Sequence, residues 1–378
     1  MARKKSYETN QKSPRAFLVG VCLTSTKKAQ ARELLDELAE LTRSADAEVV
    51  DTLLQVRKKF DPATYMGKGL LSTLVERVEA DEIDLVVLDD PLTPAQQRNL
   101  EEKLNVNVVD RSRLILDIFA RRARTAEAMA QVELAQLEYL LPRLTRAWGH
   151  LSRQYGGAIG ARGPGETQLE VDRRRVRDKI SKLKERLKKI GEQRTLRRKG
   201  RENALKVAFV GYTNAGKSTL FNRITKSSVQ VDKRLFMTLD PTSRMMASPF
   251  PCRVIFTDTV GFIRKLPHEL VESFKSTLEE VSQADLLIHV IDCSDENYPD
   301  KVFQTEKILS EIGANAPVIR AFNKIDLNPD FLPNPEKSDS SKTVLLSAKS
   351  GQGVDELKAV LLEKSREKSQ KIPLSQGK

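Results

Sequence analysis

Two short segments combine residue types whose chemistry and order along the chain are informative. The first, Gly211-Tyr212-Thr213-Asn214-Ala215-Gly216-Lys217-Ser218, lies between an apolar run and a helical pattern. In that setting small residues let backbone N–H groups wrap phosphates, and the helix N-terminus adds its positive dipole. The second, Asn323-Lys324-Ile325-Asp326, follows another apolar run. Its Asp326 can accept from N1–H and the exocyclic amine of guanine, donors that adenine lacks. Together the segments predict GTP or GDP as the ligand.

Individual residues of the two segments have expected roles. Lys217 should reach the β- and γ-phosphates, and the Ser218 hydroxyl should bind Mg²⁺. Asn323 would tie the second segment to this phosphate cradle, and Lys324 would lie over the base. The expected nucleotide contacts from the cradle are Gly211, Tyr212, Thr213, Asn214, Ala215, Gly216, Lys217, Ser218 and Thr219.

Two further segments lie where a guanine-nucleotide site requires them. Asp258-Thr259-Val260-Gly261 follows a strand predicted over Cys252–Phe256. Asp258 would hold Mg²⁺ through water, and the Gly261 N–H would sense the γ-phosphate. A third loop follows the strand predicted over residues 343–346 and fits a backbone contact to guanine O6. That loop comprises Ser347, Ala348 and Lys349.

The residues that complete catalysis are harder to assign. Between the cradle and Asp258, a threonine should close over Mg²⁺; Thr238 is our choice, and Thr242 is the alternative. Many GTPases place glutamine directly after the Asp-x-x-Gly glycine to orient the attacking water. Phe262 occupies that place here and cannot do so. We therefore name no catalytic residue and expect slow intrinsic hydrolysis unless a partner, another loop or an ion completes the site.

The elements that must position these residues form two α/β alternations. The first has strands predicted over residues 16–21, 47–56, 84–88 and 106–109, separated by helical patterns at 28–41, 70–78 and 94–104. The second has strands predicted over 205–210, 252–256, 286–291, 318–322 and 343–346. Such alternation predicts parallel sheets covered by helices, and so an α/β fold class.

A helical and basic segment separates the two alternations. Apolar residues recur at 4-3 spacing in two stripes, which predicts an antiparallel helical hairpin. From Arg111 to Lys206 there are 25 Lys and Arg against 11 Asp and Glu. Arginines pair phosphates and aromatic rings stack on unpaired bases, so the hairpin tip suits RNA, although a solvated helical surface is the alternative. The candidate RNA contacts are Arg143, Arg146, Trp148, Arg153, Tyr155 and Arg162.

These patterns divide the 378 residues into four parts. We expect an N-terminal α/β domain over 1–112, the basic hairpin over 113–200, a G domain over 201–366 and a short basic tail over 367–378. Three scattered cysteines give no disulfide framework or zinc site. No apolar run reaches the roughly 20 residues of a membrane helix, and no signal peptide begins the chain. We expect a cytoplasmic protein.

The chain resembles the HflX family of ribosome-associated GTPases. The resemblance rests on Gly163-Pro164-Gly165-Glu166-Thr167-Gln168-Leu169-Glu170, on Tyr212-Thr213-Asn214 in the cradle and on residues 236–242. It implies an N-terminal α/β domain, a helical hairpin and a Ras-like G domain. It also implies association with the large ribosomal subunit and its rRNA, and a role in splitting or rescuing stalled ribosomes. Some members carry a further C-terminal domain, for which little chain remains after Glu367.

The resemblance also bears on the missing glutamine. Several related GTPases with asparagine at the place of Asn214 bind a potassium ion there, so Asn214 is a candidate K⁺ ligand beside a plain loop-stabilising role. Two rival functions stay open. One is a nucleotide-gated RNA-binding ribosome assembly factor with negligible turnover, and the other is ATP use by the N-terminal domain, which has no Walker-type sequence. We expect a monomer.

Overall fold

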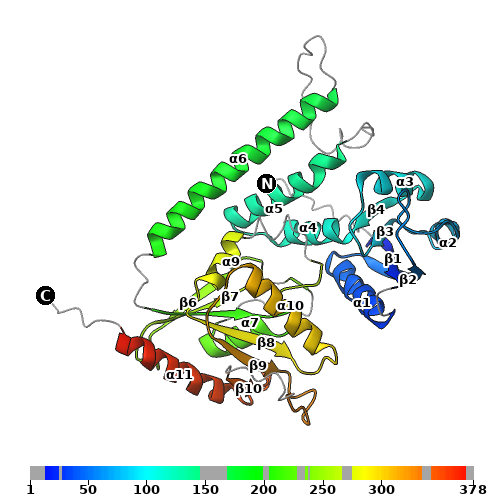
Figure 1. Cartoon of the computed structure of the whole chain (residues 1–378). Coiled ribbons are helices and arrows are strands. Elements are labelled where there is room, and N and C mark those ends of the chain that lie inside the picture. Colours follow the sequence, from blue (N-terminus) through cyan, green and yellow to red (C-terminus); the bar gives the residue numbers. More distant parts are fainter. Residues whose placement is uncertain are drawn as a thin grey trace, which may run out of the picture. The chain divides into compact units, whose positions relative to one another are not determined.

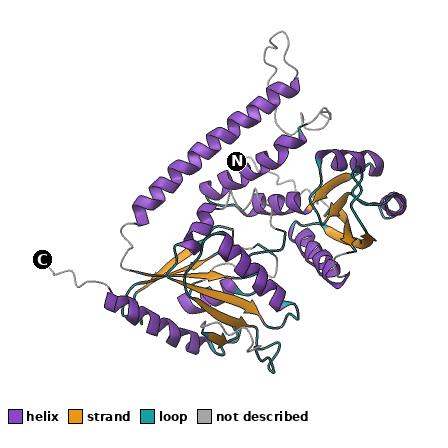
Figure 2. Cartoon of the chain, in the orientation of Figure 1, coloured by secondary structure: helices purple, strands orange, loops and turns teal. Residues whose placement is uncertain are grey.

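The computed structural model describes residues 13–24, 28–144, 168–198, 204–227, 235–236, 239–265, 275–333 and 342–371. The chain folds into two compact units, of which one ends at Ile118 and the other begins at Phe119, within α4 (Arg111–Arg122). Both units alternate strands and helices, as Figure 2 shows by colour. The predicted α/β class is therefore confirmed.

The N-terminal unit is built on a four-stranded parallel sheet in the order β2-β1-β3-β4. Its elements run β1 (Arg15–Leu23), α1 (Lys28–Ser44), β2 (Glu48–Arg57), α2 (Lys68–Ala80), β3 (Leu85–Leu88), α3 (Pro94–Leu104) and β4 (Asn107–Asp110), as labelled in Figure 1. Successive side chains of a strand point to opposite faces. Phe17 and Val19 of β1 accordingly share one apolar cluster with Leu74 of α2 and Leu100 of α3.

One buried ionic group joins three elements of this unit. The Arg111 guanidinium is 1% exposed and pairs with Glu37 of α1 and with Asp89, which follows β3, the latter at 2.5 Å. Because a buried charge is costly unless it is paired, this group requires all three side chains together. It fixes the start of α4 to the sheet.

The second unit begins with the helical hairpin. It comprises α5 (Ala126–Leu140), the short helix η1 (Leu141–Arg143) and the 31-residue α6 (Gln168–Arg198). Ala130, Leu134 and Leu137 of α5 share one apolar cluster with Ile180 and Leu183 of α6. The two predicted stripes therefore pack against each other.

A six-stranded sheet forms the rest of this unit, in the order β10-β9-β8-β5-β7-β6. Only β6 runs antiparallel to its neighbour. The elements are β5 (Leu205–Val210), α7 (Lys217–Thr225), β6 (Thr242–Met246), β7 (Val254–Asp258), α9 (Lys275–Ser282), β8 (Leu286–Asp292), α10 (Tyr298–Glu311), β9 (Val318–Asn323), β10 (Thr343–Leu345) and α11 (Val354–Lys371).

Alternation along β5 assigns the helices to the two faces of this sheet. Val207 and Phe209 join a cluster with Phe221 of α7 and Leu357 of α11. Ala208 joins a second cluster with residues of α9 and α10, together with Phe262. The cradle between β5 and α7 thus lies at the carboxyl edge of a sheet that is covered on both faces, where α/β proteins bind ligands.

Two sequence predictions about elements were wrong, and one strand was missed. The strand predicted over 252–256 runs instead over Val254–Asp258, so Asp258 ends the strand rather than following it. Strand β6 was not predicted. The tail predicted from residue 367 begins too early, because α11 continues to Lys371 and Lys368 pairs with Asp285 at 2.9 Å. In the described part of the chain, no helix combines the length and apolar character needed to cross a bilayer.

Candidate guanine-nucleotide site

The cradle owes its shape to two glycines with left-handed backbone. Gly211 has φ of 141° and Gly216 has φ of 93°. A Cβ atom on Gly211 would lie 2.3 Å from the Val290 carbonyl oxygen, and one on Gly216 would lie 2.2 Å from Nδ2 of Asn323. Since side chains do not tolerate such contacts or such φ values, only glycine fits both positions. Asn214, at the tip between them, is exposed and also has positive φ, at 60°.

Lys217 is buried at the start of α7. Its Nζ donates to the carbonyl oxygens of Gly211 at 3.1 Å and Tyr212 at 2.7 Å. Burial lowers the pKa of Lys217 to about 8, and the nearby Asp258 carboxylate opposes that shift. Lys217 is therefore hydrogen-bonded to the backbone of the cradle.

Ser218 and Asp258 lie side by side. The Ser218 hydroxyl donates to Oδ2 of Asp258 at 2.6 Å, and Asp258 is fully buried at the end of β7. A hydroxyl and a carboxylate at one point are oxygen ligands of the kind that Mg²⁺ prefers. The two residues predicted around Mg²⁺ are thus brought together by the fold.

The segment after Asp258 lies against the cradle. A Cβ on Gly261 would be 2.8 Å from Cα of Thr213 and 2.9 Å from Nζ of Lys217, so this glycine approaches Lys217 closely. The side chain of Phe262 points the other way and is buried in the apolar cluster with Val210 and Leu309. Phe262 therefore cannot orient water, as its residue type predicted.

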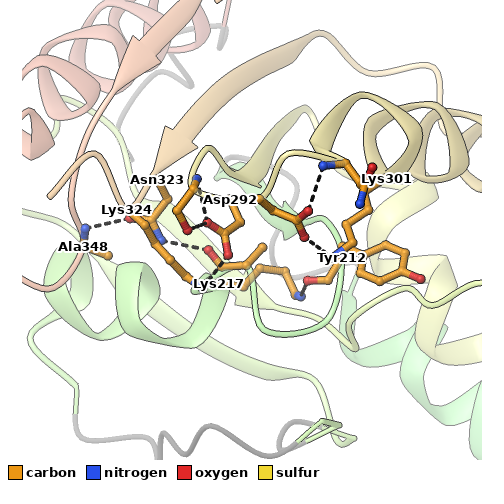
Figure 3. Close-up of polar contacts among 11 residues, drawn as sticks. Tyr212, Lys217, Asp292, Lys301, Asn323, Lys324 and Ala348 are labelled. Carbon is orange, nitrogen blue, oxygen red and sulfur yellow. Dashed lines mark hydrogen bonds and ion pairs between the residues drawn. The ribbon is translucent and has the colours of Figure 1, made fainter. Parts of the chain in front are cut away.

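Asn323 connects three loops of the site. Its Nδ2 donates to the Ala215 carbonyl in the cradle at 2.8 Å, and its Oδ1 accepts from the Ala348 N–H at 2.8 Å (Figure 3). Lys324 has left-handed backbone, and its Nζ contacts the Asp292 carboxylate at 2.5 Å. The predicted link between the segment at 323–326 and the cradle is therefore present in the fold.

The other residues predicted to contact guanine differ in their exposure. Asp326 and Lys349 are exposed beside the buried Ser347 and Ala348. Arg223 of α7 donates from Nε to the Ala348 carbonyl at 3.1 Å, and it also donates to the Lys349 carbonyl. The loop over 347–349 is thus fixed to the helix that begins at the cradle.

Some candidates lie outside the described residues or have other partners. Thr238 lies outside the described residues, and Thr242 opens β6 with its backbone in register with Asp258. The Arg143 guanidinium stacks 3.5 Å from the Tyr139 ring centroid and donates to the Tyr139 carbonyl. The other RNA-contact candidates also lie outside the described residues: Arg146, Trp148, Arg153, Tyr155 and Arg162.

Comparisons with known proteins identify the family. Three family models match successive parts of the chain: GTP-binding GTPase N-terminal over residues 32–120, GTP-binding GTPase Middle Region over 122–201 and 50S ribosome-binding GTPase over 206–324. GTPase HflX of Caldanaerobacter subterraneus subsp. tengcongensis is 50% identical over 346 residues, which is 91% of this chain and 78% of that protein. GTPase HflX of Escherichia coli is 45% identical, over 92% of this chain and 82% of that protein.

The chain belongs to the HflX GTPase family. It is accordingly a GTPase, whose sequence matches a ribosome-binding GTPase domain. A crystal structure of SsGBP in complex with GDP covers 94% of this HflX chain and 99% of its own, with 24% identity and a TM-score of 0.50. That likeness supports the shared fold alone.

Sequence reasoning missed one contact made by this HflX chain next to its nucleotide site. The Asp240 carboxylate accepts from the backbone N–H groups of Arg124 at 3.1 Å and Thr125 at 3.3 Å, and from the Thr125 hydroxyl. Nearby, the rings of Phe236 and Phe119 meet edge to face with centroids 4.6 Å apart. Asp240, which lies between the two candidate switch threonines Thr238 and Thr242, is therefore hydrogen-bonded to the start of the hairpin helix α5. Nothing in the local sequence pattern points to this pair.

Proposed function

We propose that this HflX GTPase binds the large ribosomal subunit in its GTP-bound form, takes part in splitting or rescuing stalled ribosomes, and is released by hydrolysis. The observation that carries the proposal is the bond between Asp240 and the N-terminus of α5. It joins the segment that we expect to close over the nucleotide to the helical hairpin. A change at the γ-phosphate can therefore alter the hairpin directly.

The charge of the hairpin supports an RNA partner. Helix α6 carries 13 Lys and Arg against 5 Asp and Glu over its 31 residues. A surface of this kind attracts the phosphate backbone of RNA and displaces bound cations, so binding should weaken as salt rises. The match to a 50S ribosome-binding GTPase model over the adjacent G-domain residues agrees with rRNA of the large subunit as the partner.

The hydrolytic step follows from the positions of the site residues. In the proposed mechanism, the Lys217 ammonium exchanges its carbonyl partners for the β- and γ-phosphates, whose charge favours its protonated form. Ser218 and Thr238 directly, and Asp258 through water, would hold Mg²⁺, which would neutralise phosphate charge. Gly261 would donate its N–H to the γ-phosphate, and Asp326 would accept from guanine.

Potassium is the proposed second cation. Asn214 is exposed at the tip of the cradle and has left-handed backbone, with φ of 60°. A cation held there would offset charge developing on the transferred phosphoryl group, the task that an arginine performs in other GTPases. Replacing KCl by NaCl should then slow turnover, and an Asn214→Ala variant should lose that difference.

The central test is GTP turnover in potassium buffer with and without purified large ribosomal subunits, with small subunits as the control particle. We expect large subunits to raise turnover ten-fold or more, about 1.4 kcal/mol off the barrier. Light scattering of intact ribosomes would then report splitting. Equal turnover with and without large subunits would contradict the proposal.

The buried position of Phe262 favours one alternative in that event. Because its side chain packs in the core, the described residues supply no group at the glutamine position to orient water. A protein with that site could bind RNA under nucleotide control with negligible turnover, as a ribosome assembly factor would. Nucleotide-dependent binding to large subunits without stimulated hydrolysis would identify it.

A further inference from the structure

The segment after Asp258 forms a short ladder with the cradle. The Phe262 N–H donates to the Gly211 carbonyl at 3.1 Å, and the Thr213 N–H donates to the Phe262 carbonyl at 2.8 Å. Two such bonds define the register of a short parallel pair. The position of Gly261, one residue before Phe262, therefore depends on this ladder.

A side chain continues the ladder by one step. The Arg264 N–H donates to the hydroxyl oxygen of Tyr212 at 2.7 Å, and both residues are buried. Tyr212 lies between the two cradle residues that make the backbone bonds. The Tyr212 hydroxyl oxygen therefore accepts from the Arg264 N–H in place of a backbone carbonyl of the cradle.

The Tyr212 ring is itself held in place. It is 5% exposed, and the Lys301 ammonium of α10 lies 4.9 Å from the ring centroid (Figure 3). Lys301 in turn pairs with Asp295. The Tyr212 carbonyl accepts from Lys217 at 2.7 Å. One residue thus contacts the phosphate-binding lysine through its backbone and the segment after Gly261 through its side chain.

Gly261 has little freedom to move against the cradle. Its hypothetical Cβ lies 2.8 Å from Thr213 and 2.9 Å from the Lys217 ammonium, so small shifts of the segment change the distance between the Gly261 N–H and Lys217. Hydrolysis is sensitive to displacements of this size because the groups around the transferred phosphoryl act by position.

We propose that Tyr212 is a positioning residue for GTP hydrolysis. Its hydroxyl fixes the backbone of Arg264, and through the ladder it holds Gly261 in register with Lys217. Guanine recognition and phosphate binding do not depend on that hydroxyl. This role rests on the GTPase activity of the family and is independent of any ribosomal partner.

The test is the Tyr212→Phe variant, which keeps the ring over which Lys301 lies and removes only the acceptor. We expect intrinsic kcat for GTP to fall at least five-fold, while KM for GTP and Kd for GDP stay within two-fold of wild type. Amide hydrogen exchange at Arg264 should accelerate at least ten-fold. Unchanged GDP binding shows that the variant is folded.

The matched control is Tyr298→Phe, which removes a hydroxyl from a tyrosine packed between Phe322 and Phe331 in the same unit. It should leave kcat and the Arg264 amide unchanged. Three results would overturn the proposal: an unchanged kcat in Tyr212→Phe, an unchanged Arg264 amide, or a loss of GDP affinity as large as the loss of kcat. The last result would indicate a purely structural role.

Discussion

Replacing Asn323 by aspartate is the sharpest perturbation of the nucleotide site. The substitution changes little in shape, because one amide nitrogen becomes one carboxylate oxygen. The acceptor for the Ala348 N–H, now at 2.8 Å, is retained. The donor to the Ala215 carbonyl, also at 2.8 Å, is lost, and two oxygens then face each other in a side chain that is 2% exposed.

The magnitude follows from that geometry. Leaving a buried carbonyl without its donor costs about 1–3 kcal/mol. Asn323 connects the cradle to the loop at 347–349, so this cost appears when the two loops must hold phosphate and base together. A coupling of about 1–3 kcal/mol corresponds to roughly 5- to 150-fold in affinity. We expect GDP binding to the Asn323→Asp variant to weaken by that factor at pH 8.

The pH dependence of the loss provides a second signature. A protonated carboxyl can donate to the Ala215 carbonyl and restore the bond, so the pKa of the new group should be raised by burial and by the facing oxygen. The defect in GDP binding should therefore be smaller at pH 6 than at pH 8. A fluorescent GDP analogue, titrated at both pH values, measures Kd directly.

The control for this experiment is Asn99→Asp in the N-terminal unit. Asn99 also donates to a backbone carbonyl, that of Ala63 at 2.9 Å, but at an exposed position. We expect that variant to bind GDP as the wild type does at both pH values. The reasoning is refuted if Asn323→Asp binds GDP normally at pH 8, or if its defect does not shrink at pH 6.

Three further predictions concern stability and the hairpin. Asp240→Ala should lower the free energy of unfolding by about 0.5–1.5 kcal/mol per hydrogen bond lost, because it removes the acceptor of the Arg124 and Thr125 N–H groups, and amide exchange at Thr125 should accelerate. Arg111→Met removes the buried cation that pairs with both Glu37 and Asp89, which should cost about 3–5 kcal/mol in urea unfolding. Burial, with Arg320 and Lys217 nearby, lowers the pKa of His289 from 6.5 to about 3. The contribution of neutral His289 to the free energy of unfolding is therefore fully present above pH 6.5, and it falls by up to about 1.4 kcal/mol for each pH unit below that value. In thermal melts, His289→Leu should lose less stability than the wild type between pH 6.5 and pH 5.

The parts of the site that the sequence predicted are those with strict chemical demands. Gly211 and Gly216 are required by positive φ and by close backbone neighbours, and Asn323 by a donor and an acceptor at fixed places. Because such demands allow only one residue type, these positions can be recognised from a single sequence. The two apolar stripes of the hairpin could be predicted for a related reason, since each helix packs one apolar face against the other.

Other features depend on contacts that no local pattern encodes. Strand β6 is a five-residue edge strand with two exposed and three half-buried positions, so it lacks the apolar run of a buried strand. The neighbouring strand begins at Val254, two residues later than predicted, although the Arg253 carbonyl already accepts from the Leu205 N–H of β5 at 2.9 Å. The hydroxyl of Tyr212 and the carboxylate of Asp240 bond to residues 52 and 115 positions away or more.

The cap on α5 also affects the order in which the chain can fold. During synthesis the hairpin helix leaves the ribosome well before Asp240, which is 115 residues beyond Thr125. At about 5–20 residues per second, that interval lasts roughly 6–23 seconds. Meanwhile α5 has its own local cap, the Thr125 hydroxyl, which accepts from the Ala128 N–H at 3.1 Å. The new helix therefore starts from a cap that its own sequence supplies, and the Asp240 carboxylate can bond to Thr125 only after the chain has been made as far as residue 240.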